Sequence, residues 1–224
     1  MTEPSAQNGA TSVWDLMLDV FIAPGRAMAK IADERPVGAA AWVVTGLAVF
    51  TGLLGMASAR DAMALDPGLL PSDVPPEVVE VIQALTGSAS VFGAVVGILA
   101  SVLWWFGRAA IYGLIGELMG AARDGRAILA TLGFAGLPAL LQAPLNLMLS
   151  RLGLTWLSAL VGIVFWVWLL VLTVLALRAA LRVDTGQAVV IFLIPVGVAV
   201  ALAVLVGVGL AVALVSMVGR IPTL

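Results

Sequence analysis

Five long stretches of the chain contain only uncharged and mostly apolar residues. They cover residues 37–59, 89–107, 127–149, 154–177 and 188–215, and none contains Asp, Glu, Lys or Arg. About 20 such residues span the hydrocarbon core of a membrane as a helix. Because lipid offers no hydrogen-bond partner to open backbone groups, each stretch is predicted to be a transmembrane helix. The pattern therefore predicts an all-α membrane protein, with a five-helix transmembrane domain over residues 37–224.

The composition agrees with this prediction and narrows the chemistry. Of the 224 residues, 62% are hydrophobic and 11% are charged, and the mean hydropathy is +1.15. Soluble domains carry about a quarter charged residues. The net charge of −2 implies no attraction to nucleic acid, so we expect no such partner. The chain has no Cys and no His, which removes disulfides, the commonest metal ligands and the commonest general base. We expect no metal and no cofactor.

The segment before the first span is predicted to hold two parts. Residues 1–12 are polar and are predicted to form a disordered tail. Over residues 13–36, a helix is predicted to begin near Ser12, and Pro24 divides the segment into two short helices. The apolar positions predicted to share one side are Trp14, Met17, Phe21, Met28 and Ile31. This amphipathic segment is expected to lie in the cytoplasmic membrane interface, or to pack against the cytoplasmic end of the bundle, and both can hold.

The first loop between spans is rich in proline and carboxylates. Pro67, Pro71, Pro75 and Pro76 predict a stiff external connection, closed by a short helix over residues 76–85. Its five acidic residues lack the spacing of a calcium-binding loop, so we interpret them as solvated charges.

The basic residues predict the orientation of the chain. On one side of the predicted spans lie Arg26, Lys30, Arg35, Arg108, Arg123, Arg126, Arg178 and Arg182. The other side has only Arg60, Arg151 and Arg220. Loops rich in Lys and Arg remain in the cytoplasm. The N-terminus is therefore expected in the cytoplasm and the C-terminus in the periplasm. The excess of Arg over Lys, with abundant Ala, Val and Gly, suggests a bacterial inner membrane.

Arg108 and Glu117 lie where the second span meets the cytoplasm. The apolar pattern continues past Arg108 as far as Glu117, and a helix that runs on to Gly120 is longer than a perpendicular span requires. Either its last part protrudes into the cytoplasm, or Arg108 lies at membrane depth with Glu117 nearby. Arg108 is then expected to snorkel to the interface or to contact a lipid headgroup or another anion.

Gln142 and Asn146 are predicted to share a face of the third helix because they are four residues apart. Pro138 and Pro144 are expected to bend this helix. The two amides are expected either to form hydrogen bonds between helices or to line a cavity. Gly-x-x-x-Gly spacings, as at Gly93, favour close helix packing and leave a homo-oligomer possible.

Two segments resemble the prokaryotic branch of the Yip (Ypt-interacting protein) domain family. The first is FIAPGRAMAKIADERP, from Phe21 to Pro36, which leads into the first span; the second is GAARDGRAILATLGFAGLP, from Gly120 to Pro138. The acidic and tyrosine-bearing N-terminal motif of the eukaryotic members has no counterpart here. The resemblance implies a protein with five membrane helices. It also implies relatives that act in vesicle traffic with Rab-type GTPases.

No catalytic motif accompanies these features. The sequence has no Walker loop, zincin helix or nucleophile elbow, so we expect no enzymatic activity. The first hypothesis is a Yip-type membrane protein in membrane organisation, a trafficking-like process or partner assembly. It would contact membrane lipids, and an unidentified protein at its cytoplasmic face. The alternative is a small transporter or lipid-handling protein that uses Arg108, Gln142 and Asn146. A polar cavity that reaches the middle of the membrane would favour the alternative.

Overall fold

The described part of the chain is almost entirely helical. A computed structural model describes residues 12–63, 76–122 and 124–218, which contain helices and no strand. Most of the predicted N-terminal tail, and the loop prolines Pro67, Pro71 and Pro75, lie outside these residues. The helices are α1 (Val13–Ile22), α2 (Pro24–Glu34), α3 (Val37–Met63), α4 (Pro76–Leu118), α5 (Gly125–Ala135), α6 (Ala139–Arg151), α7 (Thr155–Leu181) and α8 (Thr185–Val218).

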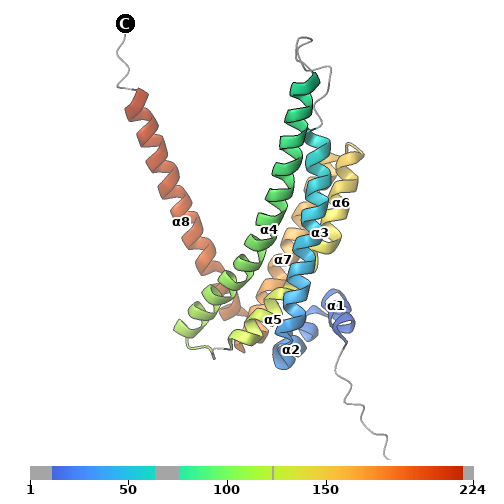
Figure 1. Ribbon diagram of the computed structural model, residues 1–224. Coiled ribbons are helices and arrows are strands. Elements are labelled where there is room, and N and C mark those ends of the chain that lie inside the picture. The colour runs from blue at the N-terminus through green and yellow to red at the C-terminus, as the bar shows by residue number, and fades with distance from the viewer. Residues whose placement is uncertain (1–11, 64–75, 123, 219–224) are drawn as a thin grey trace, which may run out of the picture.

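Five segments of the described chain are long and apolar enough to cross a membrane. They are Val37–Met56, Val91–Leu118, Gly125–Arg151, Thr155–Leu181 and Thr185–Leu210. This confirms the predicted all-α fold with five candidate spans and N-terminal helices. Helices α3 to α7 form a bundle, whereas α8 starts beside the end of α7 and then diverges from the other helices (Figure 1).

Two helix boundaries differ from the sequence prediction. The predicted short helix over residues 76–85 is wrong as a separate element, because it forms the first turns of the continuous helix α4. The polar residues that follow it include no proline. Every backbone N–H there can therefore donate a helical hydrogen bond, and the helix continues. The third span consists of two helices, because α5 ends before Gly136 and α6 begins after Pro138. Pro144 lies inside α6 without ending it.

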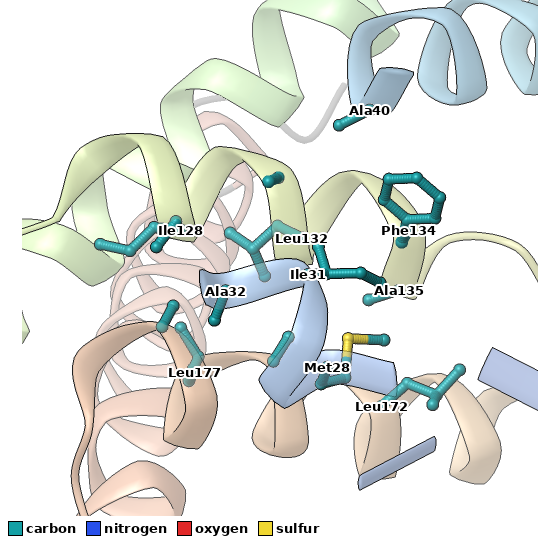
Figure 2. Close-up of a cluster of buried hydrophobic side chains, with 14 of the residues drawn as sticks. Met28, Ile31, Ala32, Ala40, Ile128, Leu132, Phe134, Ala135, Leu172 and Leu177 are labelled. Carbon is teal, nitrogen blue, oxygen red and sulfur yellow. The ribbon is translucent and has the colours of Figure 1, made fainter. Parts of the chain in front are cut away.

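The N-terminal helices begin where the sequence predicts. The backbone N–H of Trp14 donates to the Ser12 hydroxyl at 3.3 Å, which caps α1. Pro24 occupies the first turn of α2, where its missing N–H costs nothing. Met28 and Ile31 of α2 are fully buried between α5 and α7 (Figure 2). The prediction that this segment packs against the bundle is therefore confirmed.

Helix α5 forms the centre of the packed core. Most of its side chains are buried, among them Ile128 and Phe134, and it contacts α2, α3, α4 and α7. Gly133 allows α3 to approach closely, since a Cβ added there would lie 2.8 Å from the Ala40 Cβ. The Trp105 indole N–H donates to the Leu129 carbonyl at 3.0 Å and joins α4 to α5.

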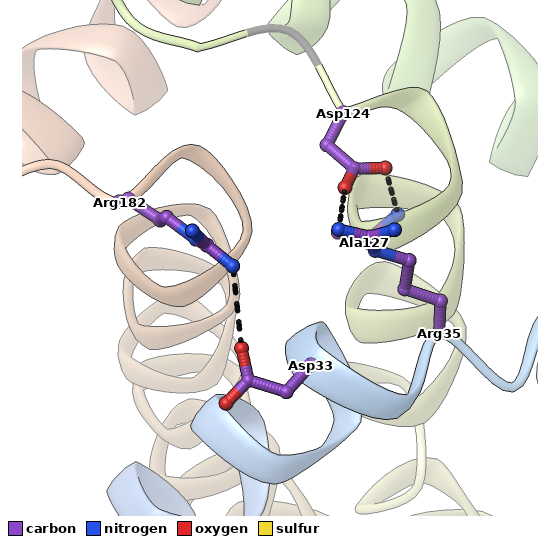
Figure 3. Close-up of polar contacts among 5 residues, drawn as sticks. All are labelled: Asp33, Arg35, Asp124, Ala127 and Arg182. Atoms are coloured by element: carbon purple, nitrogen blue, oxygen red, sulfur yellow. Dashed lines mark hydrogen bonds and ion pairs between the residues drawn. The ribbon is translucent and has the colours of Figure 1, made fainter.

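Two ion pairs connect α2 to the loops beside it. Arg35 Nη2 lies 2.8 Å from Asp124 Oδ2, and Arg182 Nη2 lies 3.5 Å from Asp33 Oδ1 (Figure 3). Helix α2, the start of α5 and the end of α7 lie at one end of the bundle, and α8 finishes at the opposite end (Figure 1). The segments that carry Arg35 and Arg182 therefore gather on one side of the molecule. Which compartment this side faces stays a prediction.

Candidate functional site

A pocket of about 340 Å³ lies among α4, α7 and α8. Its polar side chains are Arg108, Tyr112 and Thr173. Its aromatic side chains include Trp104, Trp166 and Phe192, and aliphatic residues and Pro195 complete the wall. The pocket is therefore mainly apolar, with a small polar region that contains one cationic group.

Helical spacing explains how α4 presents its part of the pocket. Trp104, Arg108 and Tyr112 follow one another at intervals of four residues, so they lie on one face of α4. The half-buried Arg108 lies beside Tyr112, and the two side chains interact electrostatically. The Tyr112 ring stacks on Phe192 of α8, with 6.4 Å between the ring centroids and 26° between the planes. These contacts hold the guanidinium beside the pocket.

The wall from α7 adds a polar atom of a different kind. The Thr173 hydroxyl donates to the Leu169 carbonyl at 2.8 Å, which leaves its oxygen able to accept a hydrogen bond. The wall from α8 is apolar and includes Pro195. The pocket thus combines the cationic Arg108 with one hydroxyl oxygen that can accept a hydrogen bond.

Contacts at the end of the bundle give the level of the pocket along the helices. Gly116 of α4 lies against Leu181 at the end of α7, since a Cβ added at Gly116 would be 2.9 Å from the Leu181 side chain. Arg108 precedes Gly116, and Thr173 precedes Leu181, by about two helical turns, or roughly 12 Å. Both pocket residues fall inside the candidate spans. Both residues thus lie about two turns inside the end of the bundle, within segments long enough to cross a hydrocarbon core about 30 Å thick.

The structure separates Arg108 from the other predicted polar residues. Glu117 is exposed near the end of α4 and does not line this pocket. Asn146 Oδ1 accepts from the Ser158 hydroxyl at 3.3 Å, a hydrogen bond that joins α6 to α7. Gln142 is half-buried on α6, and it does not line the pocket either. Arg108 instead meets Tyr112 and residues of α7 and α8.

The sequence held a signal for only part of this arrangement. The four-residue interval from Arg108 to Tyr112 places both on one helical face, and this pairing could have been found. Thr173 and Phe192 belong to other spans whose rotation and neighbours depend on packing. Nothing in their local sequence indicates that they face Arg108.

The other sites in the described residues have fewer polar or charged groups that could bind a ligand. A second cavity, of about 180 Å³ between α4 and α5, is lined by apolar residues and glycines such as Phe106, Ile128 and Gly113. The described segments contain no cluster of three or more His, Cys, Asp or Glu side chains that could hold a metal ion. The pocket beside Arg108 is therefore the candidate site.

Comparison with known families decides the classification of the chain. A family model described as the Yip1 domain matches residues 18–218. The chain belongs to the Yip1 domain family. The match confirms the resemblance of the segments that begin at Phe21 and Gly120. Comparisons with curated proteins and with solved structures gave no match.

The Yip1 domain of this chain includes the second half of α1, all of α2 and the pocket. The matched residues begin inside α1 and end with α8, so Arg108, Tyr112, Thr173 and Phe192 all lie within it. Together with the five apolar segments, the match identifies an integral membrane protein. Within this Yip1 domain, the pocket offers the positively charged guanidinium of Arg108 and an apolar wall.

Proposed function

We propose that this Yip1-family protein is a non-enzymatic, lipid-handling membrane protein. Its ligand is an amphipathic anion, namely a membrane lipid with an anionic headgroup, and its site is the pocket beside Arg108. The observation that carries the proposal is a guanidinium that lines an otherwise mainly aromatic and aliphatic pocket and belongs to a candidate span. Through this binding the protein contributes to the organisation of the membrane.

The two kinds of wall match the two parts of such a ligand. A guanidinium remains charged at physiological pH and donates several hydrogen bonds, which suits phosphate or carboxylate oxygens. The indole rings of Trp104 and Trp166 and the ring of Phe192 offer apolar contact to an acyl chain. The volume of about 340 Å³ lies in the range of small-molecule sites.

A hydrophilic solute fits these observations less well. Asn146 is hydrogen-bonded to Ser158, and the pocket beside Arg108 includes neither Asn146 nor Gln142. Transport of a polar solute needs a path of polar groups through the membrane, and Arg108, Tyr112 and Thr173 form a single local group. Lipid binding therefore explains Arg108 better than solute transport does.

Native mass spectrometry of the purified protein tests this function. The protein is released from mild detergent after incubation with equal amounts of phosphatidylglycerol, which is anionic, and phosphatidylcholine, which is zwitterionic. We expect bound phosphatidylglycerol to exceed bound phosphatidylcholine. Arg108→Gln should reduce phosphatidylglycerol binding about tenfold, because a hydrogen bond to a charged group contributes roughly 1.5–3 kcal/mol.

Arg178→Gln provides the matched control. Arg178 is an exposed arginine near the end of α7, and it does not line the pocket. Its replacement removes the same charge near the same end of the bundle, so it should leave lipid binding nearly unchanged. Equal binding by the wild type and Arg108→Gln, with both proteins folded by circular dichroism, would refute the proposed site.

A second candidate function is assembly with a protein partner at the cytoplasmic face. The feature that favours it is the outer surface of α2, where Arg26 and Lys30 are exposed while Met28 and Ile31 fix the helix in the core. Charge reversal at Arg26 and Lys30 should remove a crosslinked partner from the native membrane and leave the fold intact. Deletion of the segment is a poorer test, because it would also remove core residues. An unchanged set of crosslinked proteins would exclude this surface.

We place the protein in a bacterial inner membrane, with its N-terminus in the cytoplasm and its C-terminus in the periplasm. The segregation of basic residues among the loops supports this orientation.

A further inference from the structure

Helices α1 and α2 pack on the same bundle but expose different kinds of surface. Each buries an apolar side, with Leu16 and Val20 of α1 and Met28 and Ile31 of α2 exposed by no more than 1%. The outer side of α2 is polar and includes Arg26, Lys30, Asp33 and Glu34. The outer side of α1 is apolar, with Trp14 exposed by 72%, Leu18 by 58% and Ile22 by 78%.

The three exposed residues of α1 form one continuous stripe. They follow one another at intervals of four residues, which places them on a single face of the helix. Leu16 lies two residues after Trp14, and Val20 two residues after Leu18, so the buried side is opposite the stripe. An apolar stripe of this length that faces water would be costly, since each fully exposed large side chain forgoes about 1.5–3 kcal/mol of burial.

The contact between Phe21 and Trp168 fixes the level and rotation of α1. Their rings meet edge to face, with 5.6 Å between the centroids. On α7, Trp168 precedes Arg178, the first charged residue at that end of the span, by nearly three turns, or roughly 15 Å. The side of α1 that carries Phe21 therefore faces the interior of the membrane span.

The acidic residues of α1 lie on the side away from this contact. Asp19 is two residues from Phe21, and Asp15 is two residues from Met17, so each acid is nearly opposite an apolar residue around the helix. Asp15 and Asp19 are thus directed toward the end of the bundle, where the charged residues Arg35 and Asp124 also lie. The stripe faces sideways, away from the bundle.

The neighbouring surface of α7 indicates what covers the stripe. Val164 and Val171, which share the side of Trp168, are exposed by 64% and 50% within a candidate span. Lipid is the solvent of such a surface. The stripe on α1 continues this surface near the end of the span, at the level where tryptophan side chains favour the membrane interface.

We propose that α1 lies in the interface of the leaflet on the α2 side of the molecule, with Trp14, Leu18 and Ile22 in contact with lipid acyl chains. Asp15 and Asp19 face the water, and Met17 and Phe21 contact the bundle. The partner of this surface is the lipid bilayer rather than a second protein. The proposal does not depend on a ligand in the pocket beside Arg108, so either can fail without the other.

The absence of cysteine from the chain allows a direct test. Single variants Leu18→Cys and Ile22→Cys are labelled with a nitroxide and reconstituted into vesicles of phosphatidylglycerol and phosphatidylcholine. Electron paramagnetic resonance then compares collisions with oxygen, which concentrates in lipid, and with a water-soluble nickel complex. Because the labels replace outward-facing side chains, the buried contacts of Leu16 and Val20 remain.

Two further positions calibrate the measurement. Val164→Cys on α7 provides the reference for a lipid-facing site, and Lys30→Cys on α2 provides the reference for water. We expect labels at residues 18 and 22 to collide more with oxygen than with nickel, as at residue 164. Accessibility to nickel equal to that at residue 30 would overturn the proposal. Exclusion of both reagents would also overturn it, because it would indicate that a protein surface covers the stripe.

Discussion

Arg35 and Asp124, far apart in the sequence, meet in a contact that serves two helices. Arg35 Nη2 lies 2.8 Å from Asp124 Oδ2, and the other carboxylate oxygen, Oδ1, accepts from the Ala127 N–H at 3.1 Å (Figure 3). Arg35 ends α2 in a left-handed conformation, with φ 52°, and Asp124 caps the start of α5. One carboxylate therefore stabilises the first turn of α5 and also holds the end of α2.

Replacement of Asp124 should separate these two roles. Asp124→Ala removes both the cap and the ion pair, and we expect the free energy of unfolding to fall by about 1–2 kcal/mol. Asp124→Asn retains an oxygen that can cap α5 and loses only the charge, so the loss should be below about 1 kcal/mol at this partly exposed pair. Reversible denaturation in detergent micelles measures both. Equal losses for the two variants would show that the cap contributes little.

Gly133 should tolerate substitution poorly. An added Cβ would lie 2.8 Å from the Ala40 Cβ and 3.2 Å from the Ala40 carbonyl oxygen, and neither atom can rotate away. Gly133→Ala should therefore push α3 from α5 and cost about 1–3 kcal/mol of stability. Thermal unfolding in detergent provides the measurement.

Gly93→Ala on α4 is the matched control for this substitution. A Cβ at Gly93 meets no atom within 4 Å, so alanine should leave stability unchanged or raise it by about 0.5–1 kcal/mol. Adding Ala40→Gly to the Gly133→Ala variant should restore part of the loss, since it removes the nearest atom. Unfolding temperatures equal to the wild type in Gly133→Ala would contradict the observed packing of α3 on α5.

Tyr112 should contribute less to lipid binding than Arg108 does. Tyr112→Phe keeps the ring stacked on Phe192 and removes only the hydroxyl that interacts with Arg108. We expect phosphatidylglycerol binding to fall by roughly two- to tenfold, because a hydrogen bond contributes about 0.5–1.5 kcal/mol. Native mass spectrometry beside Arg108→Gln provides the comparison. If phosphatidylglycerol binding fell more in Tyr112→Phe than in Arg108→Gln, Arg108 would not be the main contact of the anion.

The two ends of the chain should face opposite sides of the membrane. An alkaline phosphatase fused after Leu224 should be active in intact cells, since we propose that the C-terminus lies in the periplasm. The same enzyme fused before Met1 should be inactive. Activity from both fusions, or from neither, would contradict an odd number of spans.

The sequence predicted those features of the fold that depend on local patterns. Hydrophobic length alone identified the five spans, and the positions of Ser12 and Pro24 predicted the two N-terminal helices. It placed Trp14 with Met28 on one apolar side, whereas the structure exposes Trp14 and buries Met28. Both are apolar, and only the neighbouring helices decide which of them packs inside.

The residues that form the pocket could not be predicted from local sequence patterns. In the sequence, Arg108 is a charged residue next to an apolar span. Gln142 and Asn146 are polar residues inside an apolar span, so they were equally good candidates for a site. Packing directs Arg108 toward α7 and α8 and directs Asn146 toward Ser158. The rotation of each span is set by close contacts such as that of Gly116 with Leu181. Such contacts join residues that are far apart in the sequence, so local patterns do not predict them.

A structure determined in a lipid nanodisc that contains phosphatidylglycerol tests the central claim most directly. We predict lipid density in the pocket among α4, α7 and α8, with its headgroup within hydrogen-bond distance of Arg108 and its chain along Trp166 and Phe192. The same density should be absent from the Arg108→Gln variant. A pocket closed by side chains, or lipid density that never approaches Arg108, would contradict the account.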